Sequence, residues 1–515
     1  MDRYLSVAKM IEVEKASDRA GHTYPMMMAR AGRSLADEIL LAYGSYLDRP
    51  NVLGLVGSGN NGGDALVAMT HLMDFGWPCS AYLTAGREDD PLVETFTKQG
   101  GKVVHLSQDN AFSSLLSELA DAEILLDGLL GTGIKLPLRA PVDQVLEVTA
   151  DFLAQSESTP RVVAVDCPSG INCDSGETAE DTLPADLTVC MAAVKQGLLK
   201  FPAYGYLGEL VIGDIGLDPD LPEWQGIDRY VLNETGVLAL VPERPLDGHK
   251  GTFGTALVVG GSVKYPGAPV LAAGAAFRVG AGWVEIAIPK SLHPHLAGSF
   301  REATWMPLPD DGEKFSMYAA GRFKDEVSKA DAVLLGPGIG LGGGVPGFIE
   351  EILPMINVPL VLDADGLKTV ASFVDWPTKL PSESVLTPHP GEMGILTGLP
   401  VVDIQAKRVE LAEEFAKKWG QTVVLKGAFT VVASPEGTTA ILPVATPALA
   451  RAGTGDVLAG MITGLLAQGM GTFEAACAGV WLHARAGLLA ANKAGSTAGV
   501  LSGDLVKVLP EVMPY

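Results

Sequence analysis

The stretch GTGD at residues 453–456 places two glycines and a threonine directly before Asp456, where an apolar helical pattern begins. Aspartate is a preferred residue at a helix start, so the stretch could be no more than a cap. Flexible residues before a helix also let several backbone N–H groups point at one anion. A carboxylate beside such a cradle can take a proton from a hydroxyl that attacks a phosphoryl group. The spacing therefore indicates a phosphate site with Asp456 as its base.

A second group of candidate residues lies in the first half of the chain, at the expected ends of strands. The segment 56–64, VGSGNNGGD, is a glycine-rich turn between a predicted strand and a predicted helix. Asp127 ends another strand and precedes a second glycine-rich turn at 131–133, and Asp166 and Ser169 follow a third strand. The carboxyl ends of parallel strands share one edge of a sheet, where ligands bind. Each residue alone could be a cap or turn residue, but together they indicate a binding site.

Two series of alternating strand and helix patterns must position these residues. Short β-branched runs predict buried strands, and apolar residues at helical spacing between them predict helices, which together indicate mostly parallel sheets covered on both faces. In the first series we expect strands at 51–57, 79–84, 102–106, 123–131, 161–170 and 186–192 and helices at 25–43, 62–76, 110–120 and 141–154. In the second we expect strands at 255–261, 283–289, 331–338, 358–366, 421–427 and 429–434 and helices at 456–469, 473–491 and 503–508.

A break in composition separates the two series. Segments 216–226 and 241–251 are rich in Pro, Asp and Gly. We therefore expect two α/β domains, at residues 1–225 and 235–515. The two series share a structural class but no motif, so the sequence does not support an internal duplication.

The composition limits the classes of partner. The 515 residues carry a formal net charge of −24, which argues against nucleic acid and anionic membrane surfaces, since both favour Lys/Arg patches. The five cysteines include no CxxC pair, so we expect neither a disulfide framework nor a zinc site, but a reducing compartment. The N-terminal residues mix charges and lack an apolar signal core. We expect a cytoplasmic protein with no nucleic-acid or membrane partner.

Several motifs of the first half occur together in one known family. GNNGGDALVA, DGLLGTG, VDCPSGINCDSG, ADLTVCMAAVKQGL and GELVIGDIGL resemble, in this order, the NAD(P)H-hydrate epimerase domain. The resemblance implies a Rossmann-like three-layer domain that interconverts the R and S epimers of hydrated NAD(P)H near a potassium ion. It implies a hydrate site formed by Asn60, Asn61, Gly62, Gly63, Asp64, Gly131, Thr132, Gly133, Ile134, Lys135, Leu136, Pro137 and Asp166.

The same resemblance assigns roles to single residues. Asp166 is implied as the acid/base, and Asn61, Asp127 and Ser169 as the potassium ligands. Their oxygen atoms suit a hard cation. Two positions depart from the family pattern, Ala65 where glycine is usual and Cys167 where an aliphatic residue is usual. Neither departure removes a proposed ligand.

The second half resembles another family. AGTGDVLAG is similar to the anion-hole and base motif of ribokinase-like proteins, and KYPGAPVLAA, GPGIG, DADGL, TPHPGEMGILTG and VLKGAFTVV occur in the order seen in the ADP- or ATP-dependent NAD(P)H-hydrate dehydratase. Taken alone, the histidine of TPHPGEM is a loop residue. The resemblance implies a hydrate site of Ala268, Gly338, His389 and Asp456, with Asp456 catalytic, and a site for the magnesium complex of ADP or ATP at Lys426, Gly427, Ala428, Phe429, Thr430 and Gly455.

Three departures in the second half bear on nucleotide or substrate preference. Thr446 stands where asparagine is usual, Arg451 where a small polar residue is usual, and DADGLK replaces a more usual ending in Ala-Leu-Asn. Whether ADP or ATP is the cosubstrate stays open, although fusions of this kind resemble ADP users.

The two resemblances together predict a bifunctional repair enzyme for NAD(P)H hydrate, with the epimerase supplying the S form to the dehydratase. An N-terminal Rossmann-like domain would precede a C-terminal ribokinase-like α/β domain, and we expect a homo-oligomer. The alternative is a ribokinase-like small-molecule kinase fused to a non-catalytic Rossmann-like binding module. A stable phosphoester product would identify the kinase, whereas free phosphate would identify the dehydratase.

Overall fold

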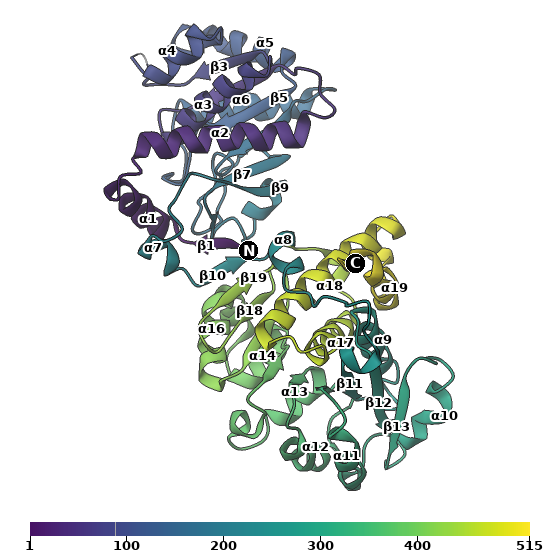
Figure 1. The fold of residues 1–515 in the computed structure, drawn as a ribbon. Coiled ribbons are helices and arrows are strands. Elements are labelled where there is room, and N and C mark those ends of the chain that lie inside the picture. The colour runs from purple at the N-terminus through teal and green to yellow at the C-terminus, as the bar shows by residue number, and fades with distance from the viewer. Residues whose placement is uncertain (88, 515) are drawn as a thin grey trace. The chain divides into compact units, whose positions relative to one another are not determined.

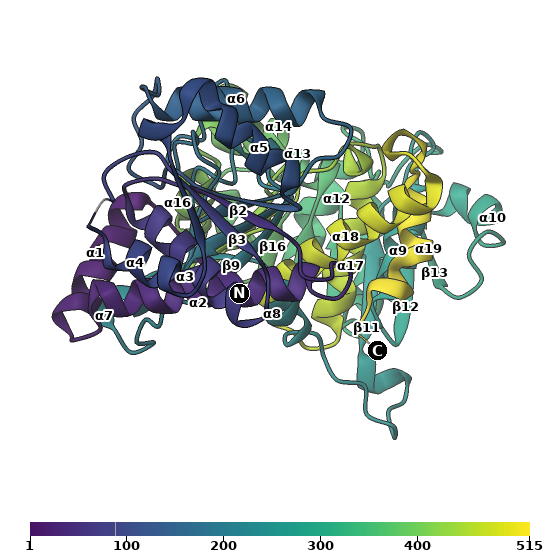
Figure 2. The same ribbon diagram turned by 90° about the horizontal axis from the view of Figure 1, so that it is seen from above.

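The computed structural model describes residues 1–87 and 89–514. The chain forms two compact units (Figures 1 and 2), one of residues 2–228 and one that begins at Arg229 and includes Met1. Both are built from mainly parallel sheets with helices on each face, which confirms the expected α/β class. No helix of the described residues is long and apolar enough to cross a membrane.

The first unit is a three-layer structure around a seven-stranded parallel sheet of order β4-β3-β2-β5-β6-β7-β9. Alternate residues of β2 enter two separate cores, since Val52 and Val56 pack with α1, α2 and α3 while Leu53 and Leu55 pack with α5 and α6. This alternation is the mark of a strand covered on both faces. The sheet strands are β2 (Val52–Val56), β3 (Cys79–Leu83), β4 (Lys102–His105), β5 (Ile124–Gly128), β6 (Arg161–Val165), β7 (Leu187–Met191) and β9 (Glu209–Gly213).

The remaining elements of the first unit are its helices and one short strand pair. The helices are α1 (Val7–Arg19), α2 (Tyr24–Tyr43), α3 (Asn60–Asp74), α4 (Pro91–Lys98), α5 (Ser113–Asp121), α6 (Val142–Gln155) and α7 (Pro222–Gln225). The pair is formed by β1 (Asp2–Leu5) and β8 (Val194–Lys195), which run parallel.

The second unit contains a sheet of order β13-β12-β11-β14-β15-β16-β17-β18-β19-β10. Its strands run parallel except at β17–β18 and β18–β19, which are antiparallel. The strands are β10 (Arg229–Val231), β11 (Thr255–Val259), β12 (Trp283–Pro289), β13 (Thr304–Leu308), β14 (Ala332–Leu335), β15 (Leu360–Leu362), β16 (Ser384–Leu386), β17 (Thr422–Leu425), β18 (Val431–Ala433) and β19 (Thr439–Ile441).

Helices cover both faces of this second sheet. Those of one core are α9 (Ala268–Arg278), α17 (Thr454–Ala467), α18 (Thr472–Ala494) and α19 (Ser502–Val512), and those of the other are α11 (Ala320–Val327), α12 (Val345–Ile352), α13 (Ala364–Val370), α14 (Pro390–Thr397), α15 (Val401–Ala406) and α16 (Arg408–Trp419). Two short helices, α8 (Glu234–Leu238) and α10 (His293–Leu296), complete the unit.

Helices α9 and α17 pack side by side so closely that glycine is required between them. A Cβ atom added to Gly460 would lie 2.1 Å from the carbonyl oxygen of Ala272, and one added to Gly464 would lie 2.6 Å from that of Ala276. The pairing advances in the same direction along both helices, so they run parallel. Ala268 and Asp456, each one turn before these contacts, therefore lie at the same end of the helix pair.

The predicted strands and helices are all present, with shifted ends. The helix expected at 456–469 begins earlier, at Thr454, so that GTGD contributes its first turn. The strand expected at 123–131 ends at Gly128, because the apolar residues after it form a turn. Asp127 accordingly lies near the end of β5, as expected.

Candidate functional site

The first unit contains a cavity of about 450 Å³ at the carboxyl ends of its central strands. The turns after β2, β5 and β6 form its base, and α1 and α2 form a wall. Most residues predicted to bind the hydrate line it. The lining residues are Ile11, Glu14, Tyr24, Met27, Met28, Ala31, Ser58, Gly59, Asn60, Asn61, Asp64, Leu129, Leu130, Gly131, Thr132, Gly133, Ile134, Asp166, Met191 and Ile215.

Asp166 is fixed at the cavity wall by a buried lysine. It directly follows β6 with a φ of 65°, a left-handed conformation that a non-glycine residue adopts only when its surroundings enforce it. Its carboxylate accepts hydrogen bonds from the Met191 N–H at 2.9 Å and from the Lys195 ammonium. Burial lowers the pKa of Lys195, but the charge of Asp166 more than offsets this and raises it. The ammonium therefore stays charged and holds the carboxylate in place.

Asp64 brings a second carboxyl group to the same cavity. It lies in the first turns of α3 and is 6% exposed. Among the described residues its carboxyl group has no hydrogen-bond or ion-pair partner. Burial raises its pKa well above the usual value, and the charge of Asp166 raises it further. Burial also raises the pKa of Glu14 on α1. Carboxyl groups in such different surroundings suit proton transfer.

Asn61, Asp127 and Ser169, the predicted potassium ligands, come together at the turn after β5. Ser169 donates its hydroxyl to Asp127 at 2.5 Å and its N–H at 2.7 Å, and its hydroxyl accepts the Leu130 N–H at 2.9 Å. The Asn61 amide donates to the Leu130 carbonyl at 3.2 Å. Asp127 is completely buried, and among the described residues no ammonium or guanidinium faces it. A buried carboxylate of this kind is costly unless a cation compensates it, and oxygen donors suit a hard cation, so the residues fit potassium.

Some predicted hydrate residues lie outside the cavity, and one important residue was missed. Gly62, Gly63 and residues 135–137 do not contribute to the lining. Gly62 instead allows α3 to approach the end of β2, because a Cβ there would lie 2.2 Å from the Gly57 carbonyl. The missed residue is Lys195, which is present in the motif MAAVKQGL but was given no role.

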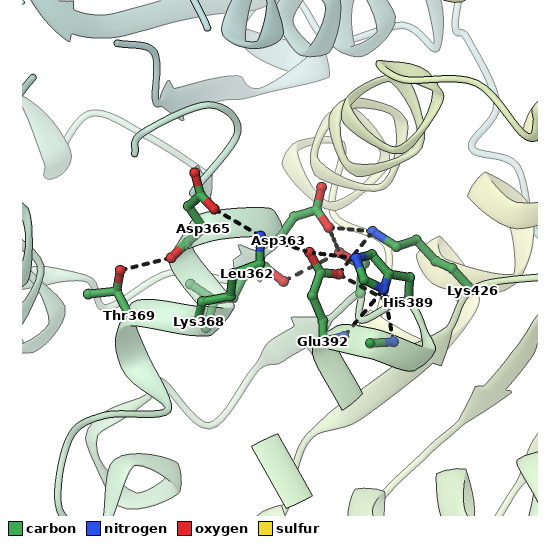
Figure 3. Close-up of polar contacts among 10 residues, drawn as sticks. Leu362, Asp363, Asp365, Lys368, Thr369, His389, Glu392 and Lys426 are labelled. Carbon is green, nitrogen blue, oxygen red and sulfur yellow. Dashed lines mark hydrogen bonds and ion pairs between the residues drawn. The ribbon is translucent and has the colours of Figure 1, made fainter. Parts of the chain in front are cut away.

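In the second unit the central polar cluster joins Asp363, Lys426 and Glu392 (Figure 3). Asp363 directly follows β15, and its carboxylate accepts hydrogen bonds from Lys426 at 2.6 Å and from the Thr387 hydroxyl at 2.8 Å. Glu392 lies 3.8 Å from the Lys426 ammonium. Burial lowers the pKa of Lys426, but the two carboxylates outweigh this and raise it. Lys426 therefore remains charged at the end of β17.

Asp456 lies in the first turn of α17, close to this cluster. A Cβ on neighbouring Gly455 would lie 3.5 Å from the Lys426 ammonium. Burial raises the pKa of Asp456 to about 7, and the charge of Asp363 raises it further while Lys426 lowers it. A carboxylate with such a pKa is well matched to general-base work near neutral pH. The preceding Gly453 has a φ of 91°, which glycine permits.

His389 is the N-cap of α14, as well as a neighbour of the cluster. Its Nδ1 accepts hydrogen bonds from the N–H groups of Gly391 at 3.0 Å and Glu392 at 3.3 Å, and Glu392 accepts the His389 N–H in return. This capping box fixes the ring with Nε2 3.4 Å from Glu392. The loop interpretation of this histidine was therefore incomplete, since the side chain caps a helix and holds its second ring nitrogen beside Glu392.

The predicted nucleotide residues form a tight turn after β17. The Thr430 hydroxyl donates to the Gly427 carbonyl at 2.8 Å, and Gly427 has a φ of 145°. Arg408 of α16 supports the turn by donating to the carbonyl groups of Leu425 and Lys426 at 2.8 and 3.2 Å. The sequence interpretation missed Arg408, because it lies on a helix for which no pattern was recognised.

Ala268 and Gly338, the other predicted hydrate residues, are in contact. A Cβ on Gly338 would lie 3.0 Å from the Cβ of Ala268 and 2.7 Å from the carbonyl oxygen of Tyr265. The Gly338 carbonyl accepts a hydrogen bond from Ser262 at 2.7 Å. Because α9 and α17 run parallel, this pair lies at the same end of the helices as Asp456.

The departures from the family pattern are accommodated locally. Ala65 is buried opposite Gly128. A Cβ added to Gly128 would lie 2.9 Å from the Ala65 methyl group, so residue 128 must be glycine when residue 65 is alanine. Thr446 caps a short helical turn by accepting the Ala448 N–H at 3.3 Å. Arg451 is exposed and donates to the Ala498 carbonyl.

Comparisons with known proteins identify relatives of both units. Residues 256–511 match the family model described as NAD(P)H-hydrate dehydratase, and residues 25–197 match the model described as YjeF-related protein N-terminus. A solved structure described as ADP/ATP-dependent NAD(P)H-hydrate dehydratase from Bacillus subtilis, co-crystallised with ATP and Mg²⁺, is 34% identical over 55% of this chain and 97% of its own, with a TM-score of 0.48.

Relatives that span both units carry one name, bifunctional NAD(P)H-hydrate repair enzyme Nnr. That of Moorella thermoacetica is 35% identical over 95% of this chain and 92% of its own length. That of Salinibacter ruber is 36% identical over 94% of this chain and 91% of its own length. That of Thermofilum pendens is 33% identical over 99% of this chain and 96% of its own length. The chain therefore belongs to the family of bifunctional NAD(P)H-hydrate repair enzymes.

Proposed function

We propose that this chain restores NAD(P)H from its hydrate, with an epimerase at residues 1–225 and an ADP- or ATP-dependent dehydratase at residues 235–515. The observation that carries the proposal is the position of Asp456, at the start of α17 beside Lys426 and with a pKa raised to about 7. This arrangement provides a base, a fixed positive charge and free backbone N–H groups at one point, which is what phosphoryl transfer to a hydroxyl requires.

In the proposed dehydration, Asp456 accepts the proton of the ring hydroxyl of the S epimer while the hydroxyl oxygen attacks the terminal phosphoryl group of the nucleotide. The nucleotide leaves with one phosphate fewer. The phosphorylated carbon then loses phosphate as its C–O bond breaks, and a proton leaves the neighbouring ring carbon, which restores the reduced nicotinamide. Lys426 and the first N–H groups of α17 stabilise the negative charge of the transferring group. The magnesium complex of ADP, our preferred cosubstrate, or of ATP enters as a substrate.

In the proposed epimerisation, Asp166 moves one proton. The hydroxyl-bearing carbon is bonded to the ring nitrogen. Transfer of the hydroxyl proton through Asp166 to that nitrogen therefore opens the C–N bond and leaves a carbonyl group. Closure on the other face reverses the transfer and gives the other epimer. Lys195 keeps the Asp166 carboxylate in position for both steps.

We further propose that Asn61, Asp127 and Ser169 hold a potassium ion in the first unit. The ion supplies positive charge beside the bound hydrate, and the support for it is the buried Asp127 carboxylate described above. We also propose that the protein is located in the cytoplasm and forms a homo-oligomer. All five cysteines are free and buried, which is consistent with a reducing compartment.

The dehydratase is tested with mixed hydrate epimers and the magnesium complex of ADP or ATP. We expect the absorbance of reduced nicotinamide to return with one free phosphate per turnover. Asp456→Asn keeps the shape of the side chain but cannot accept the proton, so dehydration should fall by on the order of a hundredfold or more. Asp403→Asn, at an exposed position of α15, is the matched control. A stable phosphoester would instead identify a small-molecule kinase, and near wild-type turnover of Asp456→Asn would exclude Asp456 as the base.

The epimerase is tested through Asp166→Asn under the same conditions. Because the two carboxylates belong to separate units, their losses should be independent. The variant should consume the S form at the normal initial rate and then slow to the uncatalysed conversion of R to S. Adding Asp456→Asn protein, whose epimerase is intact, should restore full conversion. Loss of both reactions in folded Asp166→Asn protein would argue against two separate sites.

The potassium site is tested by replacing the cation in the buffer. Epimerisation should be faster in potassium than in an equal concentration of tetramethylammonium, whose bulk excludes it from a small oxygen-lined site. Asp127→Asn should lose this difference, because it removes the buried charge that binds the ion. Equal rates in both salts for the wild type, or an unimpaired Asp127→Asn variant, would contradict the assignment.

A further inference from the structure

The second unit contains a hollow of about 590 Å³ next to the catalytic cluster. The loops after β11, β13 and β14 and the first turns of α13 form its walls. Asp365 and Lys368 line it and also reach the cluster, since the Lys368 ammonium lies 2.9 Å from Asp365 and 3.9 Å from Glu392 (Figure 3). The lining residues are Ser262, Val263, Lys264, Tyr265, Glu313, Lys314, Gly340, Leu341, Asp365 and Lys368.

Two ammonium groups in this hollow are in no ion pair among the described residues. Lys314 donates to the Leu341 carbonyl at 2.9 Å, and the Lys264 ammonium lies 5.1 Å from the centre of the Tyr265 ring. Among the residues that the structure describes, neither lysine forms an ion pair. The lining carboxylate of Asp365 is paired with Lys368, which leaves Glu313 as the remaining carboxylate of the lining. Asp311, an exposed residue outside the lining, lies near the Lys314 side chain without forming an ion pair with it, and backbone hydrogen bonds together with the charge of Lys314 lower the pKa of Asp311. In a chain of net charge −24, two unpaired ammonium groups facing one hollow indicate an anionic ligand.

The backbone holds both lysines in place. The Val263 N–H donates to the Glu313 carbonyl at 2.9 Å, which ties the loop of Lys264 to the loop of Lys314. The Lys314 N–H donates to the Asp311 carboxylate at 3.0 Å, which fixes the second loop from its other side. The hollow is therefore preformed, and a ligand that enters it gains affinity because little ordering is required.

We propose that Lys264 and Lys314 bind the pyrophosphate of the dinucleotide hydrate while its ring hydroxyl lies at Asp456. This inference rests on the proposed dehydratase. Tyr265 connects the two places, because it lines the hollow and its backbone lies against Gly338 of the predicted ring site. In a dinucleotide, one ribose separates the ring from the pyrophosphate, so a phosphate pocket directly beside the ring site fits this substrate.

The sheet order separates this hollow from the predicted nucleotide turn. The hollow is lined by the loops after β11, β13, β14 and β15, whereas the turn at 426–430 follows β17, and β16 lies between β15 and β17. The phosphates of the cosubstrate are therefore assigned to the turn and to α17, and those of the hydrate to the two lysines. An extra phosphate on the adenosine ribose offers the same chemistry, so the experiment must distinguish it from the pyrophosphate.

The test uses the full-length double variant Lys264→Gln/Lys314→Gln, with Lys324→Gln on the exposed face of α11 as a control for loss of charge. Dehydration is measured with NADH hydrate, NADPH hydrate and the hydrate of reduced nicotinamide riboside, which has no phosphate. We expect the KM of both dinucleotide hydrates to rise about tenfold, as for loss of hydrogen bonds to a charged group. The KM of the nucleotide and kcat/KM for the riboside hydrate should stay unchanged. The KM of the Lys314→Arg variant for both dinucleotide hydrates should stay close to the wild-type value.

The alternative outcomes are each decisive. A KM increase for NADPH hydrate alone would mean that the lysines bind the additional phosphate of the adenosine ribose and not the pyrophosphate. An increase only for the cosubstrate, an equal loss with the riboside hydrate, or unchanged constants would overturn the inference while leaving the dehydratase established. A wild-type protein that fails to dehydrate any hydrate would overturn the proposed function itself, and the inference with it.

Discussion

A lysine ammonium buried against an aspartate, at the carboxyl edge of a parallel sheet, organises the site of each unit. Lys195 holds Asp166 after β6, and Lys426 holds Asp363 after β15. Loss of either partner is destabilising, because an unpaired buried charge costs about 3–5 kcal/mol. The pairs are therefore fixed points, and the turns that carry them must keep one conformation. The strained φ of 65° at Asp166 persists for this reason.

Each fixed pair also changes the environment of a second carboxyl group nearby. Asp64 shares the cavity of Asp166, and Asp456 lies beside Asp363. Burial raises the pKa of both Asp64 and Asp456, and the charged aspartate of the pair adds to the effect. Each unit thus places a carboxylate held by a lysine beside a second carboxyl group whose pKa is raised, and in the second unit the pKa of that group, Asp456, is about 7. This division suits reactions that move a proton to and from a hydroxyl.

Most of the residues at the two sites could be predicted from the sequence. Most of the residues that hold them in position could not. Motifs with glycines beside acidic residues, such as GTGD, predicted the position of Asp456 because the signal is local. The role of Lys195 was not predicted, because it depends on a contact with Asp166. The two residues are distant in the sequence, and only the order of the strands brings them together. The helices α11 to α15 were also missed, since each has only six to eight residues, and the longer helices α9 and α16 were missed as well. Arg408, which supports the nucleotide turn, was lost with them. The strands that were predicted are all present, because fully buried strands are continuous apolar runs, whereas β9, β10, β13, β16 and β19 were not predicted.

The pH dependence of dehydration tests most directly whether the Asp363–Lys426 pair governs the base. Asp456 acts ionised, so kcat/KM for the hydrate should rise with pH through about 7 in the wild type. Asp363→Asn removes the charge that raises the pKa of Asp456 and releases Lys426 to face it, and both effects lower that pKa. The midpoint of the rise, which does not depend on the absolute rate, should therefore move to lower pH. A midpoint that stays in place or moves to higher pH would contradict the account.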